Sequence, residues 1–260
     1  KNMLIEGISL DQVFRNVRKE VNELTGQGTV NYDQLTGNSF YLKRATFTDD
    51  IILIDSLIEA GDYKKGLKIA NNILNEDPTN LEGLLREVQL YGKEDRKDLA
   101  LIALNKAKEL YPNSKKVYLW FAALLTLDEK YDEAHKEIDY ALQLDPNYTN
   151  AYIEQANIYY NQNKSIEAVN STSKAIELDS LNDELYFSRA FIFTEMDSII
   201  LAEKDYEKVI ELNPEYLEAY YNLGVIQYEN GLNEDALMDF EKVLEIDSTF
   251  VNAINYIGVI

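Results

Sequence analysis

The chain has 260 residues, 46% of them hydrophobic, and a formal charge of −21 that arises from 25 Lys and Arg against 46 Asp and Glu. Its apolar runs stay well below the roughly 18 residues of a membrane-spanning helix, and so acidic a chain repels phosphate backbones and anionic lipids. We therefore expect a soluble protein that binds neither nucleic acid nor membranes. Because there is no Cys, the chain has no disulfide, thiolate metal site or cysteine nucleophile of its own.

The first ten residues, KNMLIEGISL, lack the long apolar core and the small-residue cleavage site of a signal peptide. We therefore expect a cytoplasmic location. The sequence begins without an initiator Met and ends inside a repeated unit. We also expect it to be part of a longer protein.

Residues 1–46 differ from the rest of the chain in charge and periodicity. Six basic and five acidic residues give them a net charge of +1, so the negative charge lies further along. Apolar residues recur at the spacing of an amphipathic helix over residues 10–24, with Ser9 as its N-cap and Thr25-Gly26 as its end. A turn at 35–37 and a short strand at 39–42 should follow. A helix, loop and strand of this size are too small to fold alone.

This segment resembles the C-terminal end of a caspase-like (metacaspase-type, peptidase C14) domain. In that family an amphipathic helix is followed by a threonine-glycine stop, a loop and a final strand. Within the range 1–42, the positions that fit this pattern are Leu10, Val13, Phe14, Val17, Arg18, Thr25, Gly26, Leu35, Thr36, Gly37, Phe40 and Tyr41. The loop is short and lacks the proline usual there. The alternative is an unrelated helical cap on the repeats that follow.

The resemblance does not supply catalysis to this chain. A caspase-like site needs a Cys thiolate activated by a nearby His, and the resemblance implies that both lie upstream of the segment. The only His, His135, follows Ala134 in a helical pattern, and we expect it on a helix surface. We therefore expect no catalytic, cofactor-binding or metal-binding residues in this chain.

From residue 47 onward the chain follows a 34-residue period. Pro78, Pro112 and Pro146 succeed one another at that interval, and Pro214 comes two intervals later, with Ser180 in the skipped place. We number this place position 32 of each unit. The units then begin at Phe47, Leu81, Lys115, Thr149, Asp183 and Leu217, and a truncated seventh begins at Val251.

Side-chain size repeats in the same register. Position 20 is Gly or Ala in all six units, position 4 is Tyr in four consecutive units, and positions 8 and 27 favour small residues. This combination, with Pro at position 32, resembles the tetratricopeptide repeat (TPR). The resemblance implies an all-α fold, a right-handed superhelix of helix pairs, with helix A at about positions 2–14 and helix B at about 18–30. We expect residues 47–260 to form one such solenoid after the helix-loop-strand remnant of residues 1–46.

Stacking of the repeats would line the A helices along a concave groove. In the TPR family, positions 2, 5, 6, 9, 12 and 13 of helix A face that groove. The resemblance implies a peptide groove that includes Trp120, Leu119, Leu127, Ile153, Asn157, Tyr160, Phe187, Phe191, Tyr221 and Tyr228. Aromatic anchors flanked by amides suit an extended or helical peptide. The alternative is that several of these rings pack between helices.

We expect a non-catalytic protein-interaction scaffold whose partner is neutral or basic and carries an apolar anchor. The alternative is the C-terminal part of a caspase-like cysteine peptidase whose repeats recruit a substrate or regulator. TPR domains that clamp chaperone carboxylates carry Lys at position 5, where this chain has only Ile, Leu, Phe or Tyr. A partner of the chaperone type is therefore not expected.

Overall fold

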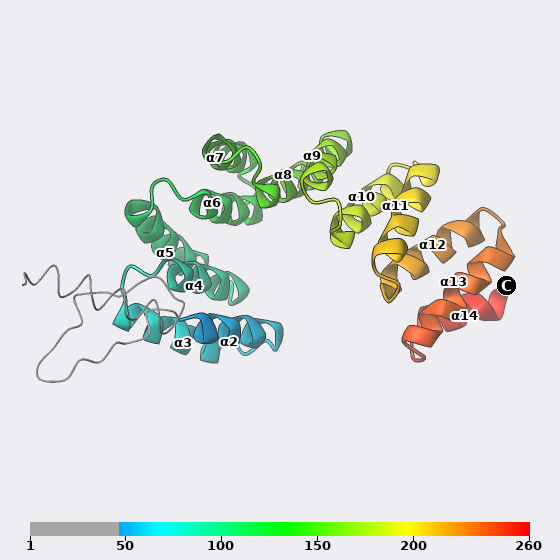
Figure 1. Cartoon of the computed structure of the whole chain (residues 1–260), viewed down its shortest axis with the longest axis horizontal. Coiled ribbons are helices and arrows are strands. Elements are labelled where there is room, and N and C mark those ends of the chain that lie inside the picture. Colours follow the sequence, from blue (N-terminus) through cyan, green and yellow to red (C-terminus); the bar gives the residue numbers. More distant parts are fainter. Residues whose placement is uncertain (1–46) are drawn as a thin grey trace, which may run out of the picture. The chain divides into compact units, whose positions relative to one another are not determined.

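The computed structural model describes residues 47–260, and all regular structure in that range is α-helical. Figure 1 shows its helices, α2 to α14, joined by short loops. The expected all-α fold of helix pairs is confirmed for this part of the chain. The helix, loop and strand predicted for residues 1–46, and the caspase-like resemblance that they carry, lie outside the described residues.

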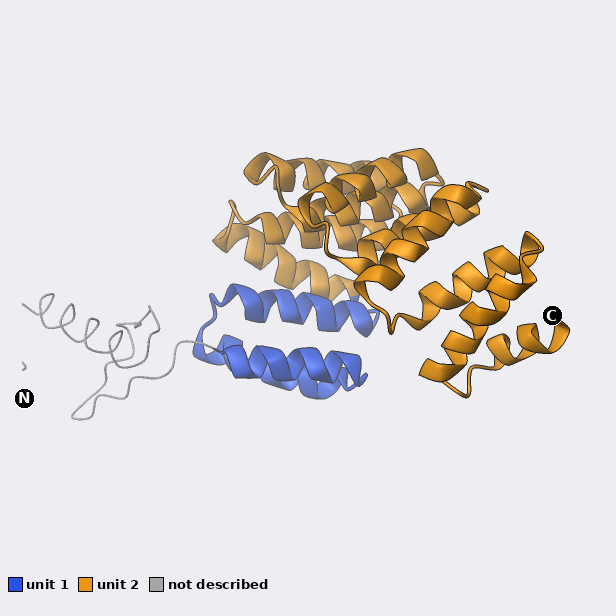
Figure 2. Cartoon of the chain, turned by 45° about the vertical axis from the view of Figure 1, so that its right-hand side comes forward, with its two compact units in different colours: residues 1–96 blue, residues 97–260 orange. Residues whose placement is uncertain are grey.

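The chain divides into two compact units, residues 1–96 and 97–260, which are coloured separately in Figure 2. The boundary falls inside the second repeat, between its A helix and its B helix. A boundary between residues 46 and 47 remains a prediction.

Three described helices belong to the first unit: α2 (Thr48–Glu59), α3 (Tyr63–Glu76) and α4 (Leu81–Lys93). They share an apolar core that includes Ile54, Ala70 and Leu90. Asp62 caps the N-terminus of α3 by accepting a hydrogen bond from the backbone N–H of Lys65 at 3.3 Å. This unit is therefore a helix pair followed by the next A helix.

The second unit contains ten helices. Within it each A helix packs against its own B helix, and each B helix packs against the following A helix. The helices are α5 (Lys97–Leu110), α6 (Lys115–Leu127), α7 (Tyr131–Leu144), α8 (Thr149–Asn161), α9 (Ser165–Leu178), α10 (Asp183–Glu195), α11 (Ile199–Leu212), α12 (Leu217–Glu229), α13 (Asn233–Ile246) and α14 (Val251–Val259). Helices begin within one residue of the predicted positions.

Small side chains occupy the helix contacts where the register placed them. At position 20, Ala134, Ala168 and Ala202 are fully buried. At position 27, Ala141 shares a core cluster with Ala151, which is position 3 of the next A helix. The small residues thus let neighbouring helices approach closely, as the pattern predicted.

The aromatic at position 4 ties helix A to the preceding loop. The hydroxyl of Tyr118 donates to the carbonyl oxygen of Pro112 at 2.7 Å, and Tyr152 bonds Pro146 in the same way at 3.1 Å. Tyr186 makes this bond to Ser180 at 3.3 Å. Because the accepting group is a backbone carbonyl, Ser can replace Pro at position 32 without loss of the contact.

A left-handed backbone residue at position 15 lies between helices A and B in each of the six complete repeats. Gly61 and Gly231 have φ of 74° and 76°, while Glu129 and Asn163 have φ of 57° and 58°. The sequence indicated this turn only where a glycine stands. The conformation disfavours residues that carry a Cβ.

Candidate functional site

Side-chain volumes at positions 8 and 24 complement each other where helices A and B meet. Large residues at position 24 face small ones at position 8 in three repeats, and the first repeat reverses the sizes. The pairs are Ala122 with Ile138, Ala190 with Tyr206, Gly224 with Phe240, and Ile54 with Ala70. A Cβ added to Gly224 would lie 3.0 Å from the Phe240 ring, so the fit is close.

The fourth repeat lacks this compensation. Both of its residues, Ala156 and Thr172, are small, and a pocket of about 250 Å³ opens beside them. Thr172 is buried and donates its hydroxyl to the carbonyl of Ala168 at 3.0 Å, so that hydroxyl is already bonded within α9. The pocket therefore exists because the repeat places two small residues opposite each other.

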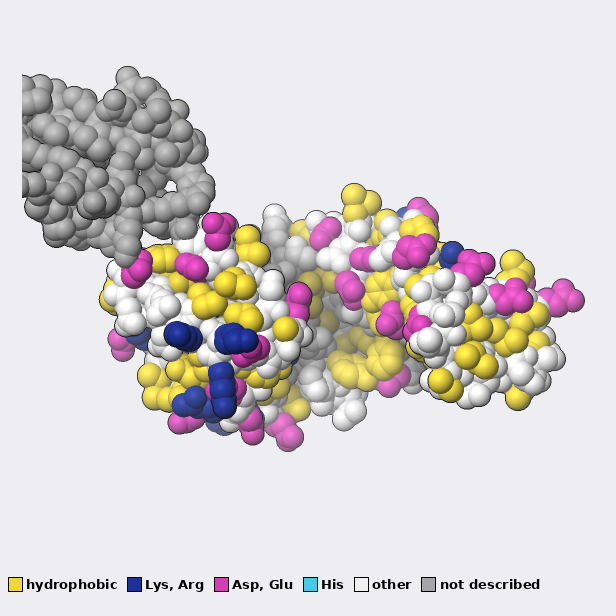
Figure 3. All heavy atoms as spheres, turned by 90° about the horizontal axis from the view of Figure 1, so that it is seen from below, with side chains coloured by type: hydrophobic (Ala, Val, Ile, Leu, Met, Phe, Trp, Pro, Cys, Tyr) yellow, Lys and Arg dark blue, Asp and Glu magenta, His cyan; other side chains and the backbone are white. Residues whose placement is uncertain are grey.

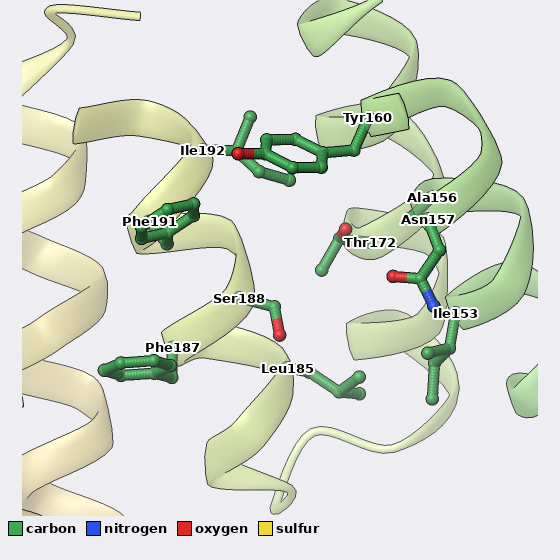
Figure 4. A pocket seen from close by; sticks show the side chains of 10 residues that line it. All are labelled: Ile153, Ala156, Asn157, Tyr160, Thr172, Leu185, Phe187, Ser188, Phe191 and Ile192. Atoms are coloured by element: carbon green, nitrogen blue, oxygen red, sulfur yellow. The ribbon is translucent and has the colours of Figure 1, made fainter. Parts of the chain in front are cut away.

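We call this the α8–α10 pocket. Figure 4 shows side chains of α8 and α10 facing one another across it, with Thr172 between them. Its lining comprises Ile153, Ala156, Asn157, Tyr160, Thr172, Leu185, Phe187, Ser188, Phe191 and Ile192. Most of these side chains are apolar, and the polar groups of the lining are three hydroxyls and one amide.

An aromatic pair forms part of the lining. The rings of Tyr160 and Phe191 lie 6.1 Å apart at 59°, and Phe191 is 42% exposed. The Tyr160 hydroxyl donates to Glu195 at 2.8 Å, and this hydrogen bond raises the pKa of Tyr160. This hydrogen bond holds the ring of Tyr160 in place. The exposed part of Phe191 is available for contact with a ligand.

A second hollow, the α6–α8 pocket, lies on the other side of Ile153 and has a volume of about 230 Å³. It is lined by Leu119, Trp120, Ala123, Asn150, Ile153 and Glu154. Trp120 is partly exposed there rather than enclosed between repeats. Since Ile153 lines both pockets, the two hollows adjoin each other on α6, α8 and α10, and we call them together the groove.

Seven of the ten residues predicted for a peptide groove line these pockets. Leu119 and Trp120 lie in the α6–α8 pocket, Asn157, Tyr160, Phe187 and Phe191 in the α8–α10 pocket, and Ile153 in both. Phe187 also stacks on Tyr216, with ring centroids 4.9 Å apart.

The other three predicted residues lie elsewhere. Leu127 is 62% exposed and lines neither pocket. The rings of Tyr221 and Tyr228 pack edge-on against Tyr256 of α14, with centroids 6.2 and 5.3 Å away. These two tyrosines therefore contribute to packing between helices. The sequence prediction did not include Thr172, although Ala156 and Thr172 are both small where three other repeats pair a small residue with a large one.

His135 lies outside the groove. Its Nε2 is 3.4 Å from Oε1 of Gln162, and its ring lies 4.5 Å from that of Tyr159. The described residues contain no group of three or more His, Asp or Glu that could hold a metal ion. Over residues 47–260, every helix is too short or too polar to cross a bilayer.

Three family matches fall on consecutive repeats. Residues 183–216 and 217–250 each match the tetratricopeptide repeat, and residues 202–231 match the TPR repeat. The first two begin where the 34-residue register places the fifth and sixth units. A comparison with curated protein sequences finds no match.

Similar solved structures are TPR proteins or contain such arrays. The chain matches the Cut9–Hcn1 APC/C hetero-tetramer with a TM-score of 0.63 and 9% identity over 96% of this chain and 46% of that one. Yeast Tom70 matches with a TM-score of 0.68 and 20% identity, over 81% of this chain and 45% of that one. YrrB is described as a TPR protein with an unusual peptide-binding site. It matches with a TM-score of 0.52 and 19% identity, over 72% of this chain and 96% of that one.

At these identities the likeness shows the fold alone. The chain spans less than half of the matched Cut9–Hcn1 and Tom70 chains. The described residues have the fold of a tetratricopeptide repeat protein, and residues 183–250 match the repeat itself.

Proposed function

We propose that this protein is an interaction scaffold that binds a peptide segment of a partner protein in the groove on α6, α8 and α10. The observation that carries the proposal is the α8–α10 pocket, an open apolar cavity at the one complete repeat of the second unit whose facing positions are both small. A pocket of this kind accepts an apolar anchor side chain, as central interface pockets do. The bound segment would run across successive A helices.

The surroundings of the groove favour a neutral or basic segment. Figure 3 shows one face of the molecule, on which hydrophobic side chains gather in patches among Asp and Glu, with Lys and Arg gathered in one area. Glu154 and Glu195 lie at the groove itself. The structural similarity to YrrB, whose description names a peptide-binding site, is consistent with the same kind of ligand.

Selection from a random-peptide library displayed on phage, with the full chain as bait, tests the proposal. Synthetic copies of the enriched peptides are then titrated by fluorescence polarisation. Thr172→Tyr should weaken binding at least about tenfold, because Tyr fills the pocket in the way that Tyr206 does opposite Ala190. Trp120→Ala should cost about 2 kcal/mol or more, as removal of a central aromatic anchor does.

Ile200→Ala provides the matched control for Phe191→Ala. Ile200 is 81% exposed and lies outside both pockets, so its removal should leave peptide affinity unchanged. Phe191→Ala should weaken binding. Failure to enrich any peptide, or equal affinity of the enriched peptides for Thr172→Tyr and the parent, would refute the proposal.

The peptidase alternative depends on residues 1–42 and on sequence upstream of them. No observation among residues 47–260 favours it. An upstream coding sequence with a His and then a Cys in a caspase-like domain would support this alternative, and the groove proposal holds in either case.

A further inference from the structure

The groove contains a half-buried carboxylate with weak partners. Glu154 stands at position 6 of α8 and lines the α6–α8 pocket. Its Oε2 accepts from the Asn157 amide at 3.3 Å, and its Oε1 lies 3.1 Å from the Thr126 hydroxyl. No Lys or Arg of the described residues forms an ion pair with it.

The contact with Thr126 satisfies Glu154 only in part. The Thr126 hydroxyl also donates to the carbonyl of Ala122, at the shorter distance of 2.8 Å. Since a hydroxyl has one proton, Glu154 receives at most a shared hydrogen bond from it. Burial raises the pKa of Glu154, and the hydrogen bonds from Asn157 and Thr126 oppose this only partly. Partly buried carboxylates in proteins are usually paired with a cation.

The other groups of the pocket suit a cation as well. Trp120 lies in the same pocket as Glu154 and is partly exposed. An indole ring attracts a guanidinium or ammonium group placed over its face, and Arg stacks best because its head group is planar. The pocket thus combines a carboxylate, an indole and the aliphatic side chains of Leu119 and Ile153. Those aliphatic groups match the methylene stem of a long basic side chain.

We propose that the α6–α8 pocket receives an Arg or Lys side chain of the bound segment while the α8–α10 pocket receives an apolar side chain of the same segment. This inference rests on the proposed function and specifies its ligand. The two pockets meet at Ile153. Neighbouring helices pack about 8–10 Å apart, and an extended chain advances about 3.3 Å per residue. Because alternate side chains of an extended chain share a face, the basic and apolar residues should be two or four positions apart.

A double-mutant cycle tests this pairing directly. The probes are an Arg-containing peptide enriched from the displayed library and the same peptide with citrulline, which keeps the shape of Arg but is neutral. On the protein side, Glu154→Gln removes the charge and retains an oxygen that can accept hydrogen bonds. Glu167→Gln on the exposed face of α9 removes one charge outside both pockets and is the matched control.

Each single change at the pocket should weaken binding about tenfold, and the two together should weaken it hardly more than one alone, because they remove the same contact. Glu167→Gln should leave the tenfold preference for Arg over citrulline intact. Independent losses for Glu154→Gln and citrulline would overturn the inference, as would enriched peptides that lack a basic residue. If those peptides still lose affinity with Thr172→Tyr, the proposed function stands and only the basic-residue pocket falls.

Discussion

Asp239 is a second half-buried carboxylate, and it makes stability depend on pH. Burial raises its pKa to about 6, the nearby Asp235 and Glu207 add to the rise, and a hydrogen bond from Gln227 opposes it. The unfolded chain has an ordinary Asp pKa near about 4. Between about pH 4 and 6 the folded state therefore binds more protons, so stability falls as pH rises through this window.

Asp239→Asn should remove this penalty. At pH 7.5 the variant should be more stable by about 1 kcal/mol, a value reduced because solvent screens this partly exposed site. At pH 4 the two proteins should unfold at nearly the same temperature, since Asp239 is then protonated. Thermal unfolding followed by circular dichroism measures both. Glu241→Gln, on the exposed face of α13, is the control, and an equal gain there would mean that only total charge matters.

Two residues one helical turn apart on α9 should differ in how much an enlarged side chain changes the stability of the chain. Ala168 is fully buried at a contact between helices, so Ala168→Leu should destabilise the chain by about 1–3 kcal/mol. Thr172 adjoins the α8–α10 pocket, so Thr172→Ile should change stability by less than about 1 kcal/mol. Urea unfolding compares them. Equal stability of Ala168→Leu and the parent would count against the packing register.

At the scale of elements, the turn between helices A and B carries strain where no glycine stands. Glu129 has φ of 57°, and a left-handed conformation costs a residue with a Cβ about 1 kcal/mol or more. Glu129→Gly should therefore stabilise the chain by about 0.5–1 kcal/mol. Glu133→Gly, inside helix α7, should destabilise it by about 1 kcal/mol. A loss of stability in both variants, measured by chemical unfolding, would contradict the strain.

Most of the helical architecture followed from the 34-residue register because each repeated residue has one packing task. Small residues at position 20 predicted close helix packing, and Ala168 is fully buried there. The recurring Tyr at position 4, such as Tyr152, donates a hydrogen bond to the loop before helix A. The non-glycine turns were missed because Glu129 and Asn163 carry no glycine signal for φ above zero. The pocket beside Thr172 was missed because it results from absent volume, which appears only when facing positions are compared.

Tyr221 and Tyr228, two of the residues predicted for the groove, make ring contacts with other helices. Tyr221 and Tyr228 occupy positions that face the groove in this family, but the aromatic residues of α13 and α14 lie within reach of their rings. The pattern of a single repeat predicts which face of a helix each residue occupies. It does not show which side chains of neighbouring helices contact that residue. Trp120 and Phe191 line the pockets, and Phe191 is 42% exposed although its ring contacts that of Tyr160.

For the whole molecule, the net charge of −21 should act on the rate of binding. A negative surface draws a basic peptide toward the groove, and salt screens that attraction. The association rate of an Arg-containing peptide should fall as salt is added, while its dissociation rate changes less. Stopped-flow fluorescence gives both rates. Salt dependence confined to dissociation would contradict steering by the acidic surface.

Trp120 allows the groove to be tested by one measurement, since it is the only tryptophan of the chain and lines the α6–α8 pocket. Its fluorescence is recorded while an enriched peptide without tryptophan is added to the parent chain and to Thr172→Tyr. We predict a saturable quench or spectral shift in the parent and at least a tenfold weaker response in the variant. Saturable binding, measured by calorimetry, that leaves Trp120 emission unchanged and is equally tight in both proteins would contradict peptide recognition in this groove.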